Sequence, residues 1–373
     1  MGSEKSESKP SRTQVRVNTV NHNYDLWENG ESMRVEDEII LAANSEPSEM
    51  DDADRQVQCS KLLGLPAELQ DEIIRNVDRS DFQALLRTCV SLRAAVIPFA
   101  LNHIVLSGFS PRLDSVVDAL HGTISRSKRV ADIIRHIQLL CDDTLSTILW
   151  KLLPLTTQLK SLDYGWVIVS EKRSEHDIIN MRHLGRALSH VKHTLVNLKV
   201  TYMVDLPDGY FSEATCGDAL LPVKEMVALH KLETTFSILF GPFTFPYTRG
   251  APGLDEILPQ GLEELKILPE RWPNDHVTRD YERRAGVITD YVCNENWRRF
   301  TPNLRLLNYD MYKDKKMCNI AWPKVYATEK ALEAAVCKNG LQWALELPQI
   351  PPVSNLRYER LRSSFEKTKA RYV

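Results

Sequence analysis

The chain has 373 residues, a net charge of −3, 43% hydrophobic residues and 26% charged residues. These fractions are typical of a folded globular protein, and the length predicts more than one structural unit. The near-neutral charge argues against a general electrostatic attraction to nucleic acid or anionic membranes. No apolar run is long enough to span a bilayer, and the polar start MGSEKSESKP lacks the apolar core of a secretory signal.

Residues 1–60 are predicted to form a disordered acidic leader. They are rich in Ser, Glu, Asp and Asn, and no basic residue occurs between Arg34 and Arg55. Such a segment buries too little apolar surface to offset its chain entropy. The stretch VEDEIILAA within it could form a short docking helix or no structure at all. Gly2 and Ser6 fit the N-myristoylation pattern, which a polar N-terminus also matches by chance.

The cysteines are scattered, and no two have CxxC spacing. They are Cys59, Cys89, Cys141, Cys216, Cys293, Cys318 and Cys337. An odd, scattered set without a secretory signal is typical of free thiols in a reducing compartment, so we expect a cytoplasmic or nuclear protein.

Residues 61–108 are predicted to form three short helices. In the first, apolar residues recur four apart on one helical face: Leu65, Leu69, Ile73 and Val77. Pro66 suits the first helical position, where its missing N–H is not needed. Three helices of this length have a marginal joint core, so we expect them to pack on the rest of the chain or on a partner.

Capping signals and apolar patterns indicate the second and third helices. Ser80 with Gln83 three residues later forms a capping-box pattern. The second helix then carries an apolar face of Phe82, Leu85, Leu86 and Cys89. The third runs from Leu92 to Phe99, and Pro98 is expected to help end it.

Residues 109–350 show a recurring strand pattern, in which an apolar residue is followed by two spacers and another apolar residue. It is read in QLKSLDY (158–164), TLVNLKV (194–200), KLETTFSILF (231–240), GLEELKIL (261–268) and NLRLLNY (303–309), more weakly in IIRHIQLL (133–140), and in a closing GLQWALEL (340–347). The intervals of about 25 to 42 residues are close to those of solenoid repeats.

Helical patterns lie between these strands. They fall at Leu113–Leu120, Leu145–Leu153, Leu184–Val191, 281–297 and 329–336. Alternating strands and helices predict parallel strands joined by helical crossovers, and so an α/β fold. Residues 351–373 are predicted to be a basic C-terminal helix or tail.

The stretch LPAELQDEIIRNVDRSDFQALLRTC resembles the F-box of filamentous fungal proteins. It carries Leu65-Pro66, apolar residues four apart, and Asp81-Phe82 before a second apolar helix. The family often has Trp near the third helix, where this chain has Leu92.

This resemblance implies a three-helix domain that binds the Skp adaptor of a Skp–cullin–F-box ubiquitin ligase. The residues that it would pack internally or against the adaptor are Leu65, Pro66, Leu69, Ile73, Val77, Phe82, Leu85 and Cys89. Residues 109–350 are similar to degenerate leucine-rich repeats, although the Asn of a typical repeat is irregular here. A repeat array of this kind would form an irregular solenoid with an extended surface for one protein substrate.

Two aromatic segments are candidates for substrate contact, because aromatic residues and Arg are enriched at binding hot spots. The first is the loop from Phe240 to Gly253, and the second is the RWPND turn. The candidate residues are Phe243, Phe245, Tyr247, Arg249 and Trp272. The alternative is that these rings pack into the flank of the repeat array.

Catalytic motifs are missing from the sequence: there is no GxSxG, HExxH, P-loop or GxGxxG. His183, His190 and His193, with Asp177 upstream, suggest a metal site, but solvated histidines explain them more simply. We therefore expect no cofactor and no catalysis by this chain, with chemistry left to the ligase complex. Two alternatives remain: a repeat scaffold in which the three helices are only a cap, and an enzyme with an unrecognised site.

Overall fold

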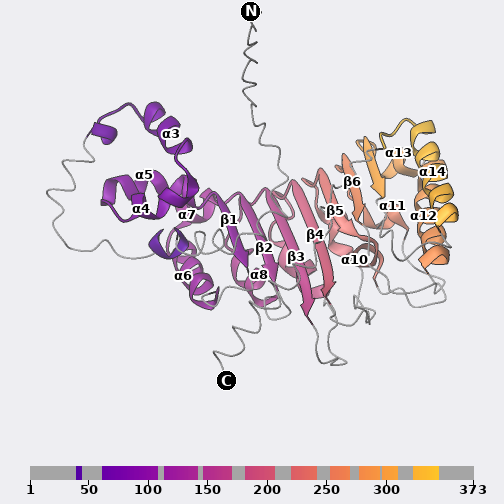
Figure 1. The fold of residues 1–373 in the computed structure, drawn as a ribbon, viewed down its shortest axis with the longest axis horizontal. Helices are drawn as coiled ribbons and strands as arrows, with labels where there is room; N and C mark the ends of the chain where they lie inside the picture. The colour runs from indigo at the N-terminus through magenta and orange to yellow at the C-terminus, as the bar shows by residue number, and fades with distance from the viewer. Residues whose placement is uncertain are drawn as a thin grey trace, which may run out of the picture.

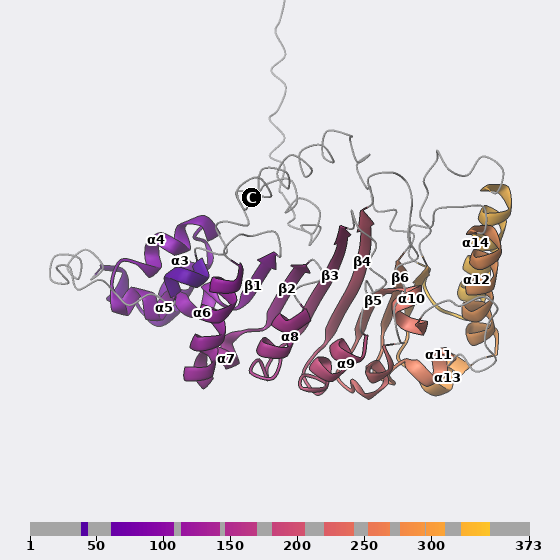
Figure 2. The ribbon, with the colours of Figure 1, turned by 90° about the horizontal axis from the view of Figure 1, so that it is seen from below.

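The computed structural model describes residues 39–43, 61–107, 113–141, 146–169, 181–205, 220–241, 253–268, 277–294, 296–309 and 322–343. Within these residues the fold is α/β, and seven strands form one parallel sheet in the order β1 to β7. The strands follow one another along an elongated molecule (Figure 1), with helices on one side of the sheet (Figure 2).

Each strand pairs with the next strand in the chain. The strands are β1 (His103–Ser107), β2 (His136–Cys141), β3 (Ser161–Val169), β4 (Asn197–Asp205), β5 (Lys231–Thr235), β6 (Glu264–Leu268) and β7 (Leu306–Tyr309). Because all neighbours are parallel, each connection must cross back over one face of the sheet.

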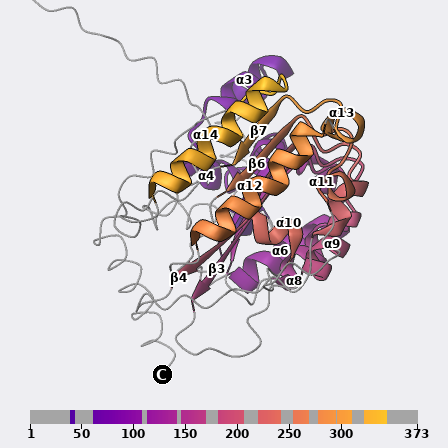
Figure 3. The same ribbon diagram turned by 90° about the vertical axis from the view of Figure 1, so that its right-hand side faces the viewer.

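The connections contain most of the helices. They are α6 (Leu113–Arg126) and α7 (Lys128–Ile133), α8 (Ser146–Leu152), α9 (Met181–Ser189), the 3₁₀ helix η4 (Leu221–Glu225), α10 (Phe236–Phe240) and α11 (Leu254–Ile257), and α12 (Val277–Cys293) and α13 (Asn296–Phe300). Helix α14 (Trp322–Lys338) follows β7, and α12 and α14 lie side by side at that end of the sheet (Figure 3).

A group of short helices lies before β1. They are α3 (Ala67–Arg75), the 3₁₀ helix η2 (Arg79–Asp81), α4 (Phe82–Leu86) and α5 (Val90–Ala100). They lie within residues 61–108, for which the sequence predicts three short helices; the 3₁₀ helix η2 was not predicted. Strand β1 also lies within that range, yet it pairs with β2 and so belongs to the sheet.

Three parallel rows of buried side chains form the core between the sheet and the helices. The first row lies two residues before each strand's first paired residue: Leu101, Ile134, Leu159, Leu195, Leu229, Leu262 and Leu304. The second row is Ile104, Ile137, Leu162, Leu198, Leu232, Leu265 and Leu307. The third row is Leu106, Leu139, Tyr164, Val200, Thr234, Ile267 and Tyr309.

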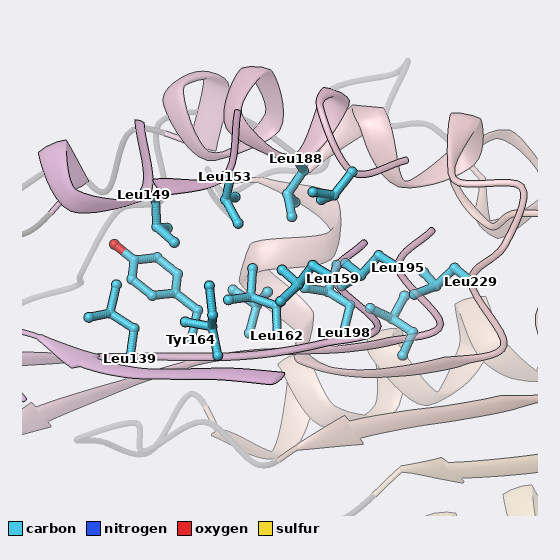
Figure 4. Close-up of a cluster of buried hydrophobic side chains, with 14 of the residues drawn as sticks. Leu139, Leu149, Leu153, Leu159, Leu162, Tyr164, Leu188, Leu195, Leu198 and Leu229 are labelled. Atoms are coloured by element: carbon cyan, nitrogen blue, oxygen red, sulfur yellow. The ribbon is translucent and has the colours of Figure 1, made fainter. Parts of the chain in front are cut away.

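The first two rows are the predicted pattern of an apolar residue, two spacers and an apolar residue. Leu149 on α8, Leu188 on α9 and Leu153, just after α8, cover them from the opposite side (Figure 4). Equivalent positions recur at intervals from 25 residues (136 to 161) to 42 residues (264 to 306), as the sequence predicts.

A backbone contact repeats at the start of every strand pair. The carbonyl oxygen just before one strand accepts hydrogen bonds from two consecutive N–H groups of the next, at 2.7 to 3.1 Å. The accepting residues are Asn102, Arg135, Lys160, Val196, His230 and Glu263. In the same way, the carbonyl oxygen of Arg305 accepts a hydrogen bond from the N–H of Gln342, and Gln342 forms a parallel β-bridge with Leu306. This repeated contact aligns each strand in the same register with the strand before it.

Several elements differ from the sequence-based prediction. The stretch KLETTFSILF is not one strand, because β5 ends at Thr235 and α10 begins at Phe236. The helix predicted for 281–297 is two helices, α12 and α13. The predicted closing strand, GLQWALEL, is described only as far as Trp343. Within that part the chain turns at Gly340, which has a φ of 84°, and Gln342 then forms a single parallel bridge to Leu306.

Part of the predicted acidic leader is folded. Residues 39–43 are helical, and four of them are at least 95% buried in the core: Ile39, Ile40, Ala42 and Ala43. The guanidinium Nη2 of Arg93 on α5 donates to the carbonyl oxygen of Ala43 at 2.7 Å. The structure therefore places this short stretch against the helical group instead of in a disordered segment. The other residues of 1–60 lie outside the described residues.

The row structure makes a direct prediction about stability. Leu162→Ala leaves a cavity in the second row between two neighbouring strands, so it should lower the free energy of unfolding by about 2–5 kcal/mol. Val227→Ala, which shortens a side chain that is 64% exposed, should change it by less than about 0.5 kcal/mol. Urea unfolding of both variants measures the difference, and equal effects would contradict the assigned core.

Candidate functional site

Helix α3 starts directly after the Leu65-Pro66 pair. The sequence predicts Pro66 at the first helical position, but Pro66 is the N-cap, with φ of −53°, and the helix begins at Ala67. The side-chain amide of Gln70 donates to the carbonyl oxygens of Leu63, at 3.1 Å, and Leu65, at 2.7 Å. These hydrogen bonds hold the preceding turn against the helix, so the start of α3 has a defined geometry.

The inner side of α3 packs on the other helices of the group. Ile74 is 1% exposed and belongs to the same apolar core as Phe82, Leu86 and Val96. The Arg75 guanidinium carbon lies 5.8 Å from the centre of the Phe99 ring on α5, within the range of a cation–π contact. Helix α3 thus packs on the helical group through Ile74 and Arg75. Neither residue belongs to the set of apolar residues four apart that the sequence pattern singles out.

The outer side of α3 is apolar and faces solvent. Leu69 is 47% exposed and Ile73 is 42% exposed. Residues four apart lie on one face of a helix, and Pro66 lies on the same side one turn earlier. Pro66 is also exposed. An apolar stripe over two turns therefore remains uncovered on a helix that packs on the group through Ile74.

The eight predicted adaptor-binding residues divide by exposure. The exposed ones are Pro66, Leu69 and Ile73, and the half-buried ones are Leu65, Val77 and Leu85. Phe82 and Cys89 are buried within the helical group. Only the first two sets can contact a partner without unfolding the group, so the remaining two have a packing role.

The second and third helices begin differently from the prediction. The capping box at Ser80 does not form: residues 79–81 make the 3₁₀ turn η2, and α4 starts at Phe82 without a side-chain cap. Cys89 caps α5, and its Sγ accepts a hydrogen bond from the Leu92 N–H at 3.4 Å. Pro98 lies inside α5, which continues to Ala100.

Leu92 occupies the position where F-box sequences often have Trp. It is 4% exposed and lies in the apolar core with the other buried residues of α5. Leu92 therefore has a packing role within the helical group.

Two residues of this region were missed by the sequence-based reasoning. Val90, at the start of α5, is an apolar residue that is 55% exposed. The sequence shows that it is apolar but does not show that it is exposed. Arg79 joins the helical group to β1 through its side chain, and no sequence pattern points to that contact.

The five predicted substrate-contact residues, Phe243, Phe245, Tyr247, Arg249 and Trp272, lie outside the described residues. The described neighbour of the first segment is α10, where the Phe236 and Phe240 rings stack at 4.3 Å between centroids. Phe236 is fully buried, and the Arg284 guanidinium carbon lies 4.9 Å from its ring centre. These described rings therefore belong to the core of the sheet.

The face of the sheet opposite the helices is polar. One aligned row across it contains Gln138, Asp163, Lys199, Glu233 and Lys266. Lys199 Nζ lies 3.0 Å from Glu233 Oε1. In the neighbouring row, Lys231 Nζ lies 2.7 Å from Glu264 Oε1. Opposite charges on adjacent strands thus lie across an extended, partly exposed face.

No metal centre is found in the part of the chain that the structure describes, since no three metal-binding side chains come together there. His190 and His193 are exposed, and His183 makes an edge contact with Trp150 at 5.8 Å between ring centroids. Asp177 lies outside the described residues. Among the described helices, none combines the length and apolar character needed to cross a membrane.

Comparison with known proteins gives no match: no protein-family model matches the chain, and neither does any curated protein.

A pair of histidines lies where the helical group meets the sheet. The rings of His103 on β1 and His136 on β2 make an edge contact at 6.0 Å between centroids. Partial burial, with the charges of Arg79 and His136 nearby, lowers the pKa of His103 from 6.5 to about 4. Burial, together with Arg135, also lowers the pKa of His136. Both rings are therefore held in the neutral form near neutral pH.

This pair predicts a pH dependence of stability. The unfolded chain binds a proton at His103 near pH 6.5 and the folded chain only near pH 4, so acid favours the unfolded state. Stability should be complete above about pH 6.5 and fall between pH 6.5 and 4. His103→Gln should make that fall shallower in urea titrations, whereas the exposed His193→Gln should keep the wild-type profile. Identical profiles for the two variants would contradict the assignment.

Proposed function

We propose that this chain is the substrate-recognition subunit of a Skp–cullin–F-box ubiquitin ligase. The helical group of residues 61–102 would bind the Skp-type adaptor, and the sheet would bind a protein substrate. The observation that carries the proposal is the uncovered apolar side of α3, formed by Pro66, Leu69 and Ile73. It lies in the same stretch of sequence that resembles an F-box.

The exposure of Leu69 and Ile73 supports a docking role because it is unfavourable in the isolated chain. Removing apolar surface from water stabilises a complex by about 25 cal/mol per Å². The inner side of α3 is fixed by Ile74 and Arg75, so the outer side is presented without a folding cost on binding. A rigid, apolar helix face of this kind suits a groove or helix pair on a partner protein.

The sheet supports the second half of the proposal. Its strands recur at irregular intervals and stack three rows of buried, mainly apolar side chains, as expected for a degenerate leucine-rich-repeat solenoid. The face opposite the helices is extended and polar, with ion pairs such as Lys199–Glu233. We propose that the substrate binds along this face and its adjoining loops, where Phe243, Phe245, Tyr247, Arg249 and Trp272 are sequence-based candidates.

In this role the chain performs no chemistry of its own and needs no cofactor. It would hold a substrate near the ubiquitin-loaded enzyme that the cullin–RING assembly recruits, which raises the rate by proximity. Such ligases act in the cytoplasm and nucleus, consistent with the scattered cysteines of this sequence.

A second candidate is a repeat scaffold outside any ubiquitin ligase, in which the helical group only caps the sheet. The observation that favours it is the continuity of the two parts: α5 ends at Ala100 and β1 begins at His103, with the fully buried Leu101 between them. A pure cap needs no exposed apolar side, however, so Leu69 and Ile73 favour the adaptor-binding role.

The adaptor-binding role predicts the outcome of a double substitution. Leu69→Ala with Ile73→Ala should weaken binding of purified Skp-type adaptor by about a hundredfold or more, because two central apolar contacts are lost. The free energy of unfolding should change by no more than about 1 kcal/mol, since both side chains are already exposed. Isothermal titration calorimetry and urea unfolding measure the two effects.

Val227→Ala is the matched control, since it removes an exposed aliphatic side chain from a turn of the sheet region. It should bind the adaptor as tightly as the wild type. If the wild-type chain binds no Skp-type adaptor, or if the double variant binds as well as wild type, the proposed function is wrong.

A further inference from the structure

The junction between the helical group and the sheet is short. Helix α5 ends at Ala100, and β1 begins three residues later at His103. The last carbonyl groups of a helix have no partner within the helix and carry part of its negative dipole. The carbonyl oxygen of Ala100 is one of these groups, so a cation placed beside it is favoured.

A second acceptor lies on the free edge of β1. The carbonyl of Asn102 faces β2, because it accepts hydrogen bonds from the N–H groups of Arg135 and His136. Successive carbonyls of a strand point to opposite edges, so that of His103 faces away from β2. Strand β1 is the first of the sheet, and among the described strands none pairs with this edge.

Arg79 reaches both acceptors. It belongs to η2, the turn between α3 and α4, and lies 21 residues before Ala100. Its Nη2 donates to the carbonyl oxygen of Ala100 at 3.2 Å and to that of His103 at 2.5 Å. One nitrogen of one guanidinium thus joins the middle of the helical group to the end of α5 and to the sheet.

We propose that Arg79 is a positioning residue that clamps the helical group onto the edge of β1 and so fixes the direction in which Leu69 and Ile73 face. Apolar packing around Leu101 and Val96 holds the two parts together, but the hydrophobic effect is non-directional. Hydrogen bonds from a charged donor to two carbonyls are directional and stronger than neutral ones. The clamp therefore supplies orientation in addition to cohesion.

The consequence for function rests on the proposed ligase role. If the outer side of α3 binds an adaptor and the sheet binds a substrate, the angle between them decides where the substrate is held. A loosened clamp would leave both binding surfaces intact and would change only their relative placement.

The test compares Arg79→Ala with Arg87→Ala in the full chain without any partner. Arg87 is an exposed arginine of the same helical group, so its removal causes the same change in charge. Spin labels are introduced through non-natural amino acids at the exposed positions Glu72 on α3 and His193 before β4, which leaves the native cysteines in place. The measurement is the distribution of distances between the two labels.

We expect a single narrow distribution for the wild type and for Arg87→Ala, and a broader one for Arg79→Ala. Arg79→Lys, which keeps the charge on a shorter side chain with a different donor geometry, should fall between them. An Arg79→Ala distribution as narrow as that of the wild type would overturn the proposal.

An NMR titration of His103 gives a second readout at the same junction. The Arg79 charge opposes protonation of His103, so the pKa of His103 should rise in Arg79→Ala and stay unchanged in Arg87→Ala. An unchanged pKa in Arg79→Ala would show that the guanidinium does not lie at this junction. Neither measurement uses the adaptor, so a failure of the clamp and a failure of adaptor binding are separate results.

Discussion

The structure depends on the alignment of each strand with the strand before it. No strand of four to nine residues buries its apolar side alone, and the three rows of side chains exist only because all seven described strands share one register. The repeated carbonyl contact before each strand sets that register. Connections of very different lengths are therefore tolerated, because they leave the aligned positions unchanged.

The helical group extends this stacked core at the β1 end and differs from it in one respect. Each apolar row of the sheet is covered by helices, whereas the outer side of α3 is left uncovered at Leu69 and Ile73. The inner side of α3, Arg79 and the fully buried Leu101 tie the group to the sheet. The molecule thus has an exposed apolar helix side at one end and a long polar face along the sheet. The proposed receptor would use the first to bind its adaptor and the second to bind its substrate.

Much of the sheet could be predicted from spacing alone, because an apolar residue, two spacers and an apolar residue define a strand entering a shared core. Strand β1 could not, since two residues separate it from α5 and no turn signal marks its start. The end of β5 was also missed, because TTFSILF is apolar enough for strand or helix. On α3, Ile73 and Ile74 are adjacent, and spacing does not say which faces inward. The contact of Arg79 depends on positions 21 and 24 residues away, which no local pattern encodes.

The most direct test of the proposed function is a cryo-electron microscopy structure of the full chain co-purified with a Skp-type adaptor and its cullin. We expect Leu69 and Ile73 to be buried against the adaptor while the polar face of the sheet projects away from it. A complex in which the adaptor contacts another surface and leaves these two side chains in solvent would contradict it. So would a preparation in which no adaptor accompanies the chain.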